Sequence, residues 1–182
     1  MRADAARNRQ RIFDEAHRAI TAGEITLTLN ELARRSGVGV GTVYRLFPTQ
    51  RAMLEAVLED SVRGLIAVAT EAEQNPEPVQ ALIGFLHEAL SAALAQPGLI
   101  DILITATDET DSLREAKAEL GAETSFLLER IRPAPAVTGE NLLKLLCGLI
   151  HAVNEHPADR QAAATDAYLR ILQGGLSPRP AP

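Results

Sequence analysis

The chain has 182 residues, 46% of them hydrophobic and 3% aromatic, and its 18 basic and 24 acidic side chains give a net charge of −6. This length supports a hydrophobic core without a metal or a disulfide, and a single cysteine, Cys147, excludes a disulfide framework. The start Met-Arg-Ala-Asp lacks the apolar run of a signal peptide, and we expect no apolar stretch long enough to cross a bilayer. The expected location is therefore the cytoplasm, with no membrane partner.

The charge is distributed unevenly. Residues 1–51 contain nine arginines and five acidic residues, a net charge of +4, whereas the rest contains nine basic and nineteen acidic residues, a net charge of −10. Phosphate contacts need only local positive charge. This asymmetry predicts a DNA-binding head at 1–51 on an acidic helical body at 52–176, with residues 177–182 as a flexible tail.

The spacing of apolar residues predicts an all-α fold of about nine helices, since no run of alternating β-branched residues occurs. Thr49 and Thr138 are predicted N-caps, and Ser112 with Glu115 forms a predicted capping box. Gly174-Gly175 is expected to end the last helix, and Pro133 and Pro135 mark a loop. Seven helices are predicted at about 6–22, 49–73, 79–94, 99–106, 112–131, 139–156 and 159–173.

The remaining two helices are predicted within residues 28–47. Thr28 and Glu31 form a capping box, in which the hydroxyl and the carboxylate satisfy free backbone amides at the helix start. Ala33 is the small residue needed where two helices cross, Gly37 suits a left-handed turn, and Val43 is an apolar anchor. This spacing predicts a helix-turn-helix motif.

The outer face of the second helix in this motif is predicted to carry Val40, Gly41, Thr42, Tyr44 and Arg45. A helix in this position enters the major groove of DNA in proteins that contain the motif. The expected partner is therefore double-stranded DNA.

Residues 28–54 resemble the head of the tetracycline-repressor (TetR) family. The resemblance rests on the Thr-capped helix, the Leu32-Ala33 pair, the Gly37-Val38 turn, the segment Gly41-Thr42-Val43-Tyr44 and Phe47-Pro48. It implies a homodimer with a three-helix DNA-binding head and a C-terminal helical domain that binds a small ligand and dimerises. Beyond about residue 75 the resemblance rests on helix order and on the segment 142–148.

The chain departs from the family pattern at three positions. Gly39 replaces the frequent Ser that opens the recognition helix, and Leu46 replaces a frequent His before the Phe. Gln50 replaces the frequent Lys at the start of the fourth helix, with Arg51 next to it. Phosphate binding at that helix is therefore expected to be weaker or shifted by one residue.

Tyr44 is expected to bond a phosphate, Thr42 to contact a phosphate or a thymine methyl group, and Val40 and Gly41 to lie nearest the bases. Arg45 either supplies charge or is a solvated helix residue. The predicted DNA-binding set is Thr28, Val40, Gly41, Thr42, Tyr44, Arg45, Gln50 and Arg51. Four N-terminal arginines form either an arm over a DNA strand or a solvated end: Arg2, Arg7, Arg9 and Arg11.

The sequence gives a weaker signal for the ligand site. For each candidate residue taken alone, an ordinary position in the core or at the edge of a helix's apolar face is the simpler interpretation. Mostly apolar surroundings favour an apolar or amphipathic effector of unknown identity. The candidate lining is Phe85, His87, Thr105, Phe126, Cys147, His151 and Asn154.

An enzyme is not expected. Cys147 and His151 lie one helical turn apart, but no third group orients them. The sequence contains no phosphate-binding glycine loop, metal-binding signature or esterase elbow, so neither a cofactor nor a metal is expected.

The resulting hypothesis is a dimeric repressor that a small effector releases from a pseudo-palindromic operator. Its dimer interface is expected in the last two helices, at Leu143, Leu146, Ile150 and Leu172. Two alternatives remain open: a DNA-tethered module that binds a protein partner without an inducer, and an enzyme that processes a small molecule.

Overall fold

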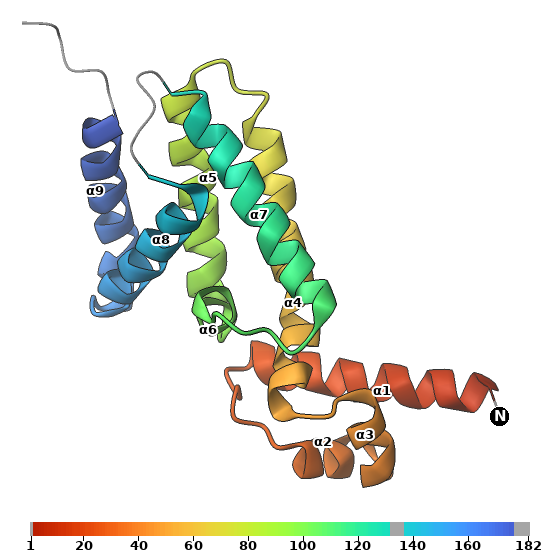
Figure 1. The fold of residues 1–182 in the computed structure, drawn as a ribbon. Coiled ribbons are helices and arrows are strands. Elements are labelled where there is room, and N and C mark those ends of the chain that lie inside the picture. Colours follow the sequence, from red (N-terminus) through yellow and green to blue (C-terminus); the bar gives the residue numbers. More distant parts are fainter. Residues whose placement is uncertain (1, 132–136, 177–182) are drawn as a thin grey trace, which may run out of the picture. The chain divides into compact units, whose positions relative to one another are not determined.

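The computed structural model describes residues 2–131 and 137–176 (Figure 1). All regular elements in these two ranges are α-helices, which confirms the predicted all-α class and the number of helices. In chain order they are α1 (Arg2–Thr21), α2 (Leu29–Ser36), α3 (Val40–Leu46), α4 (Gln50–Ala72), α5 (Pro78–Ala95), α6 (Leu99–Ile104), α7 (Asp111–Glu129), α8 (Gly139–Asn154) and α9 (Ala158–Leu176).

Three threonines cap helices as predicted. The hydroxyls of Thr28 and Thr138 each accept a hydrogen bond of 3.2 Å from the backbone N–H three residues later, at the starts of α2 and α8. Thr49 does the same for α4 at 2.9 Å. These bonds satisfy amides that have no partner inside the helix, so they define where each helix begins.

Other helix ends differ from the predictions. Helix α7 begins at Asp111, so Ser112 lies inside it instead of capping it, and the Ser112 hydroxyl donates a 2.6 Å hydrogen bond to Glu59. Helix α9 continues through Gly174 and Gly175 to Leu176, since a glycine inside a helix costs only about 1 kcal/mol. Helix α1 begins at Arg2 instead of near residue 6. The predicted loop at Pro133 and Pro135 and the predicted tail lie outside the described residues.

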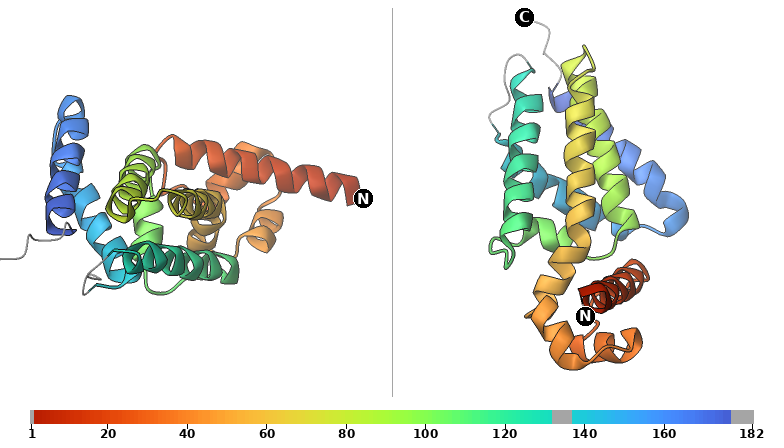
Figure 2. Two further views of the ribbon diagram at one scale, coloured as in Figure 1. Left: turned by 90° about the horizontal axis from the view of Figure 1, so that it is seen from above. Right: turned by 90° about the vertical axis from the view of Figure 1, so that its right-hand side faces the viewer.

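The chain folds into two compact units, the first containing residues up to Asp60 together with Gln96–Arg114. In this unit α2 packs against both α1 and α3 (Figure 2). The apolar faces of these helices and of the first turns of α4 form a single core. Its fully buried side chains include Ile12, Ala16, Ile20, Leu32, Val43, Met53 and Leu58.

The second unit contains Ser61–Ala95 and the chain from Glu115 onward. In it α5, α8 and α9 each pack against the other two. Phe85, Leu86 and Leu90 of α5 are almost completely buried, as are Ile150 of α8 and Leu169 of α9. These helices form the apolar centre of the unit.

Helix α5 corrects one expectation from the sequence. Over Pro78–Ala95 its mean hydropathy is 1.3, so within the described ranges one helix is long and apolar enough, by length and composition alone, to cross a bilayer. The helix packs against α8 and α9, and seven of its apolar residues are buried: Ala81, Leu82, Phe85, Leu86, Ala89, Leu90 and Ala93. We therefore interpret α5 as a core helix of the second unit.

The compact units do not coincide with the predicted functional domains. The first unit extends along α4 to Asp60 and includes α6, whereas the predicted DNA-binding domain ends at residue 51. The compact units reflect how the residues pack and not what they bind. The predicted boundary of the DNA-binding domain at residue 51 therefore stays a prediction.

Candidate DNA-binding site

Helices α2 and α3 form a helix-turn-helix whose turn requires glycine. Gly37 adopts φ 65° and ψ 31°, a left-handed conformation, and both its N–H and that of Val38 bond the carbonyl oxygen of Ala33. A Cβ at this position would also lie 3.1 Å from Nη2 of Arg11. The turn predicted at Gly37 is therefore confirmed, together with the conformational reason for it.

The interior of the motif is apolar and tightly packed. Leu32 and Val43 are completely buried, and Ala33 is 2% exposed. Ser36, the last residue of α2, is also buried and donates its hydroxyl to the carbonyl of Ala33 at 3.3 Å. Small side chains at the crossing let α3 approach α2 closely, which fixes the orientation of the recognition helix.

The capping box is formed only in part. The Thr28 hydroxyl accepts the predicted bond, but the Glu31 carboxylate accepts hydrogen bonds from Arg34 and Arg35 instead. Arg35 also bonds Glu24, with its closest N–O distance at 2.7 Å. These hydrogen bonds lower the pKa of Glu24 and Glu31. The network neutralises two arginines and attaches α2 to the loop before it.

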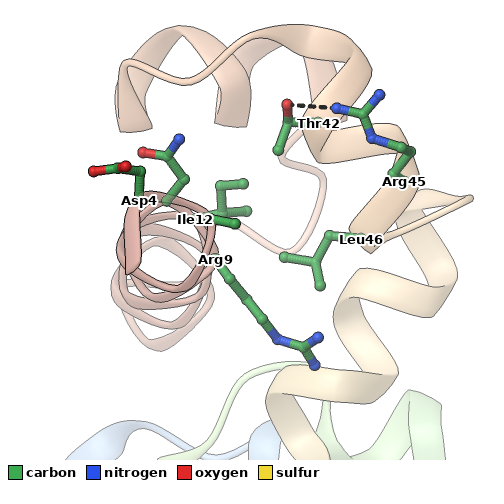
Figure 3. A pocket seen from close by; sticks show the side chains of 8 residues that line it. Asp4, Arg9, Ile12, Thr42, Arg45 and Leu46 are labelled. Atoms are coloured by element: carbon green, nitrogen blue, oxygen red, sulfur yellow. Dashed lines mark hydrogen bonds between the residues drawn. The ribbon is translucent and has the colours of Figure 1, made fainter. Parts of the chain in front are cut away.

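The outer face of α3 carries the predicted contact residues. Val40 and Tyr44 are 45% and 46% exposed, and Gly41 and Arg45 are exposed as well. The Thr42 hydroxyl accepts a 3.0 Å hydrogen bond from Nη2 of Arg45, which orients the guanidinium (Figure 3). An apolar side chain and an aromatic ring exposed next to a positioned cation suit a surface that another molecule covers.

The two predicted contacts at the start of α4 are partly buried and form hydrogen bonds within the unit. Gln50 donates its side-chain amide to the carbonyl of Ile25 at 3.3 Å. Arg51 bonds the completely buried Glu55 through Nε at 2.9 Å. DNA binding by Gln50 and Arg51 stays a prediction, and Thr28 at the start of α2 is exposed.

A groove of about 540 Å³ lies between α1 and α3. Its lining is Asp4, Ala5, Asn8, Arg9, Ile12, Thr42, Arg45 and Leu46 (Figure 3). Arg7, Arg9 and Arg11 lie on α1 and not on an extended arm. The groove was not predicted from the sequence. Arg9 and the core residue Ile12 lie one helical turn apart, and this spacing places Arg9 beside the core.

The candidate ligand residues have very different exposures. Phe85 and Cys147 are buried, whereas Phe126 is 48% exposed. Thr105 belongs to the first unit, where its hydroxyl bonds the carbonyl of Asp101 at 2.5 Å. Three further candidates are exposed: His87, His151 and Asn154. The predicted lining stays a prediction, and Phe85 and Cys147 are the members that face a protein interior.

Cys147 and His151 do not form a reactive pair. Cys147 is buried, which raises the pKa of its thiol and keeps it protonated, while His151 is exposed. No group of three or more His, Cys, Asp or Glu residues able to hold a metal ion occurs in the described parts of the chain.

Known proteins resemble the chain in this same region. The sequence model "Bacterial regulatory proteins, tetR family" matches residues 12–57. An HTH-type transcriptional regulator of Staphylococcus aureus is 30% identical over 101 residues, which are 50% of this chain. The chain spans 55% of the length of that curated relative.

Two solved structures extend the likeness to the whole chain. The TetR transcription regulatory protein from Mycobacterium vanbaalenii is 32% identical, with a TM-score of 0.53, over 97% of this chain and 99% of that one. FadR from Bacillus subtilis in complex with stearoyl-CoA shares the fold at 16% identity, with a TM-score of 0.64, over 92% of this chain and 99% of that one. The family model matches the helix-turn-helix region, and the protein from Mycobacterium vanbaalenii matches nearly the whole chain at 32% identity. The chain therefore belongs to the TetR family of bacterial transcriptional regulators.

Proposed function

We propose that this regulator is a homodimeric repressor that binds a pseudo-palindromic operator through α3 and is released by a small effector. The observation that carries the proposal is the outer face of α3, where exposed Val40 and Tyr44 flank an Arg45 held by Thr42. Two such helices would enter successive major grooves, with half-site centres about 34 to 36 Å apart. Its place of action would be the cytoplasm.

Each residue on this face has a distinct proposed role. The Tyr44 hydroxyl donates to a phosphate, and Arg45 adds a second phosphate contact that positions the helix. Val40 and Gly41 lie nearest the bases, where small apolar groups contact thymine methyls. Thr28 is exposed at the start of α2 and offers a further phosphate contact.

The proposed dimer face differs from the residues predicted from sequence. Leu146 and Ile150 are buried within the second unit at 2% and 0% exposure, so their side chains already have partners inside the protomer. Leu145 and Ile171 are 47% and 71% exposed on α8 and α9. We therefore assign Leu145 and Ile171 to the dimer face, flanked by the partly buried Leu143 and Leu172.

The proposed effector is apolar or amphipathic. A relative with the same fold, FadR, is in complex with stearoyl-CoA, and the core of the second unit is built from Phe and Leu side chains. Effector binding would shift α4, and a coupling free energy of about 1 to 3 kcal/mol would change operator affinity about five- to 150-fold. Effector and DNA must then weaken each other's binding equally.

The first test is fluorescence-anisotropy binding of the full chain to tiled duplexes from around its own coding region, at two salt concentrations. One tile is expected to bind tightly, with an affinity that falls as salt rises. Tyr44→Phe should weaken this binding because it removes only the phosphate-bonding hydroxyl.

Tyr168→Phe is the matched control, since the Tyr168 hydroxyl interacts with His156 in the second unit at 3.2 Å. Equal weak binding to every tile, or equal effects of the two Tyr→Phe variants, would overturn the assignment of α3 as the operator-reading helix.

A further inference from the structure

Ion pairs neutralise most of the described arginines in the DNA-binding head, so its remaining positive charge lies at a few positions. Within residues 4–51, acidic side chains pair with five of the arginines: Arg7, Arg18, Arg34, Arg35 and Arg51. Among the arginines whose side chains are described there, this leaves Arg9, Arg11 and Arg45 without a carboxylate partner. The uncompensated charge therefore belongs to α1 and α3.

These three arginines lie around the helix-turn-helix. Arg9 and Arg45 both line the groove between α1 and α3, and Arg11 lies beside the turn at Gly37. Figure 3 shows the Arg9 side chain leaving α1 on the side of Leu46. The one acidic residue in the lining, Asp4, is paired with Arg7 at 2.9 Å. Each of the two helices that line the groove, α1 and α3, therefore contributes to its lining one arginine without a carboxylate partner.

The lining fits a nucleic-acid backbone. Arg9 and Arg45 provide planar donors that match a phosphate, and the Asn8 side chain adds an amide donor. Leu46 contributes partly exposed apolar surface, which suits the C–H groups of a sugar, and the buried Ile12 lies beneath it. A positive groove with an apolar floor is the chemistry of a sugar-phosphate contact and not of base recognition.

We propose that the groove between α1 and α3 holds the DNA backbone, with Arg9 as a phosphate contact supplied by α1. This inference rests on the proposed operator binding and adds a second helix to the DNA-binding surface. Because phosphates carry no sequence information, Arg9 strengthens binding to all duplexes and sets the position of α3 in the groove of the operator.

The test compares Arg9→Gln with Arg18→Gln. Both arginines are exposed on α1 and both changes remove one positive charge, but Arg18 is paired with Glu15. Arg9→Gln is expected to weaken binding to the operator and to a scrambled duplex alike, by about three- to tenfold. The slope of log K against log salt should fall by about 0.9 per head. Binding and slope indistinguishable from those of Arg18→Gln would overturn the proposal.

A second measurement locates the phosphate. Operator duplexes are prepared with a neutral methylphosphonate at one backbone position at a time. We expect one position at which the wild-type protein loses affinity while Arg9→Gln loses none, because the contact is already absent in the variant. A purely structural effect of Arg9 would produce no such position, and its absence would overturn the assignment.

The failure of this inference is distinguishable from that of the proposed function. If wild-type protein binds no duplex, or Tyr44→Phe has no effect, operator reading by α3 is wrong and the groove assignment falls with it. If Tyr44→Phe weakens binding while Arg9→Gln behaves like Arg18→Gln, only the contact from α1 is wrong.

Discussion

Nε of Arg51 donates a 2.9 Å hydrogen bond to Oε1 of Glu55, a carboxylate with no exposed surface. Glu55 also accepts hydrogen bonds from the backbone N–H groups of Glu109 and Thr110 and from the Thr110 hydroxyl, at 2.9 to 3.1 Å. This single carboxylate therefore attaches the start of α4 to the loop that precedes α7.

Replacing Glu55 by Gln should destabilise the fold. The amide keeps one acceptor oxygen but places an NH₂ group where the second oxygen receives donors, so buried N–H groups lose their partners. Such a loss costs about 1 to 3 kcal/mol, which urea denaturation would measure. Glu88→Gln, on the exposed face of α5, is the control and should change stability little. A Glu55→Gln effect as small as that of the control would contradict this account.

The same carboxylate should make stability depend on pH. Burial alone would raise the pKa of Glu55, but the hydrogen bonds from Glu109, Arg51 and Thr110 outweigh it, and the pKa is lowered. Its contribution is therefore fully present above the unfolded-state pKa of about 4.3 and is lost as pH falls through the folded-state pKa. Urea titrations between pH 7 and 3 should show that the free energy of unfolding falls more steeply with decreasing pH for the wild type than for Glu55→Gln. Parallel curves would refute the prediction.

Replacing Glu123 by Gln should stabilise the second unit at neutral pH. A hydrogen bond with Glu73 raises the pKa of Glu123, assisted by burial and by the negative charges of Glu73 and Glu119. The folded state therefore holds the proton more strongly than the unfolded state, and stability falls as pH rises through this pKa.

In Glu123→Gln the hydrogen bond can persist without the repulsion, and we expect a gain of about 0.5 kcal/mol at pH 7. Thermal denaturation at pH 7 and pH 4 measures the difference, which should shrink at the lower pH. Glu129→Gln, on an exposed position of the same helix, is the control. A loss of stability on Glu123→Gln would show that the pair is not strained.

Gly139→Ala should destabilise the protein because α8 begins in contact with α7. A Cβ at Gly139 would lie 2.5 Å from the carbonyl oxygen of Gly121 and 2.6 Å from the backbone N of Ser125. Backbone atoms cannot move aside easily, so overpacking should cost about 1 to 3 kcal/mol.

The control for Gly139 is Gly84→Ala on an exposed position of α5, where a Cβ has no neighbour within 4 Å. This change should stabilise by about 0.5 to 1 kcal/mol, since alanine is the better helix residue. Chemical denaturation of both variants measures the contrast, and equal shifts in the same direction would rule out the proposed contact.

Much of the fold and the turn of the DNA-binding motif could be predicted from sequence because they depend on local interactions. A threonine that bonds an amide three residues later, a glycine with positive φ and apolar residues one helical turn apart act within a few residues. Thr28, Gly37 and Val43 are such cases, and the structure places all three as predicted.

Only the tertiary structure decided which side chains are available for binding. Gln50 and Arg51 are polar residues at the start of a helix, and their partners Ile25 and Asp101 are distant in sequence. Leu146 and Leu145 are adjacent leucines, yet one is buried and the other exposed. The groove between Arg9 and Arg45 exists because α1 packs near α3. The sequence by itself determined the helices and the helix-turn-helix motif. Long-range packing determined which polar and apolar side chains remain free to bind, because that packing joins residues that lie far apart in the sequence and share no local pattern.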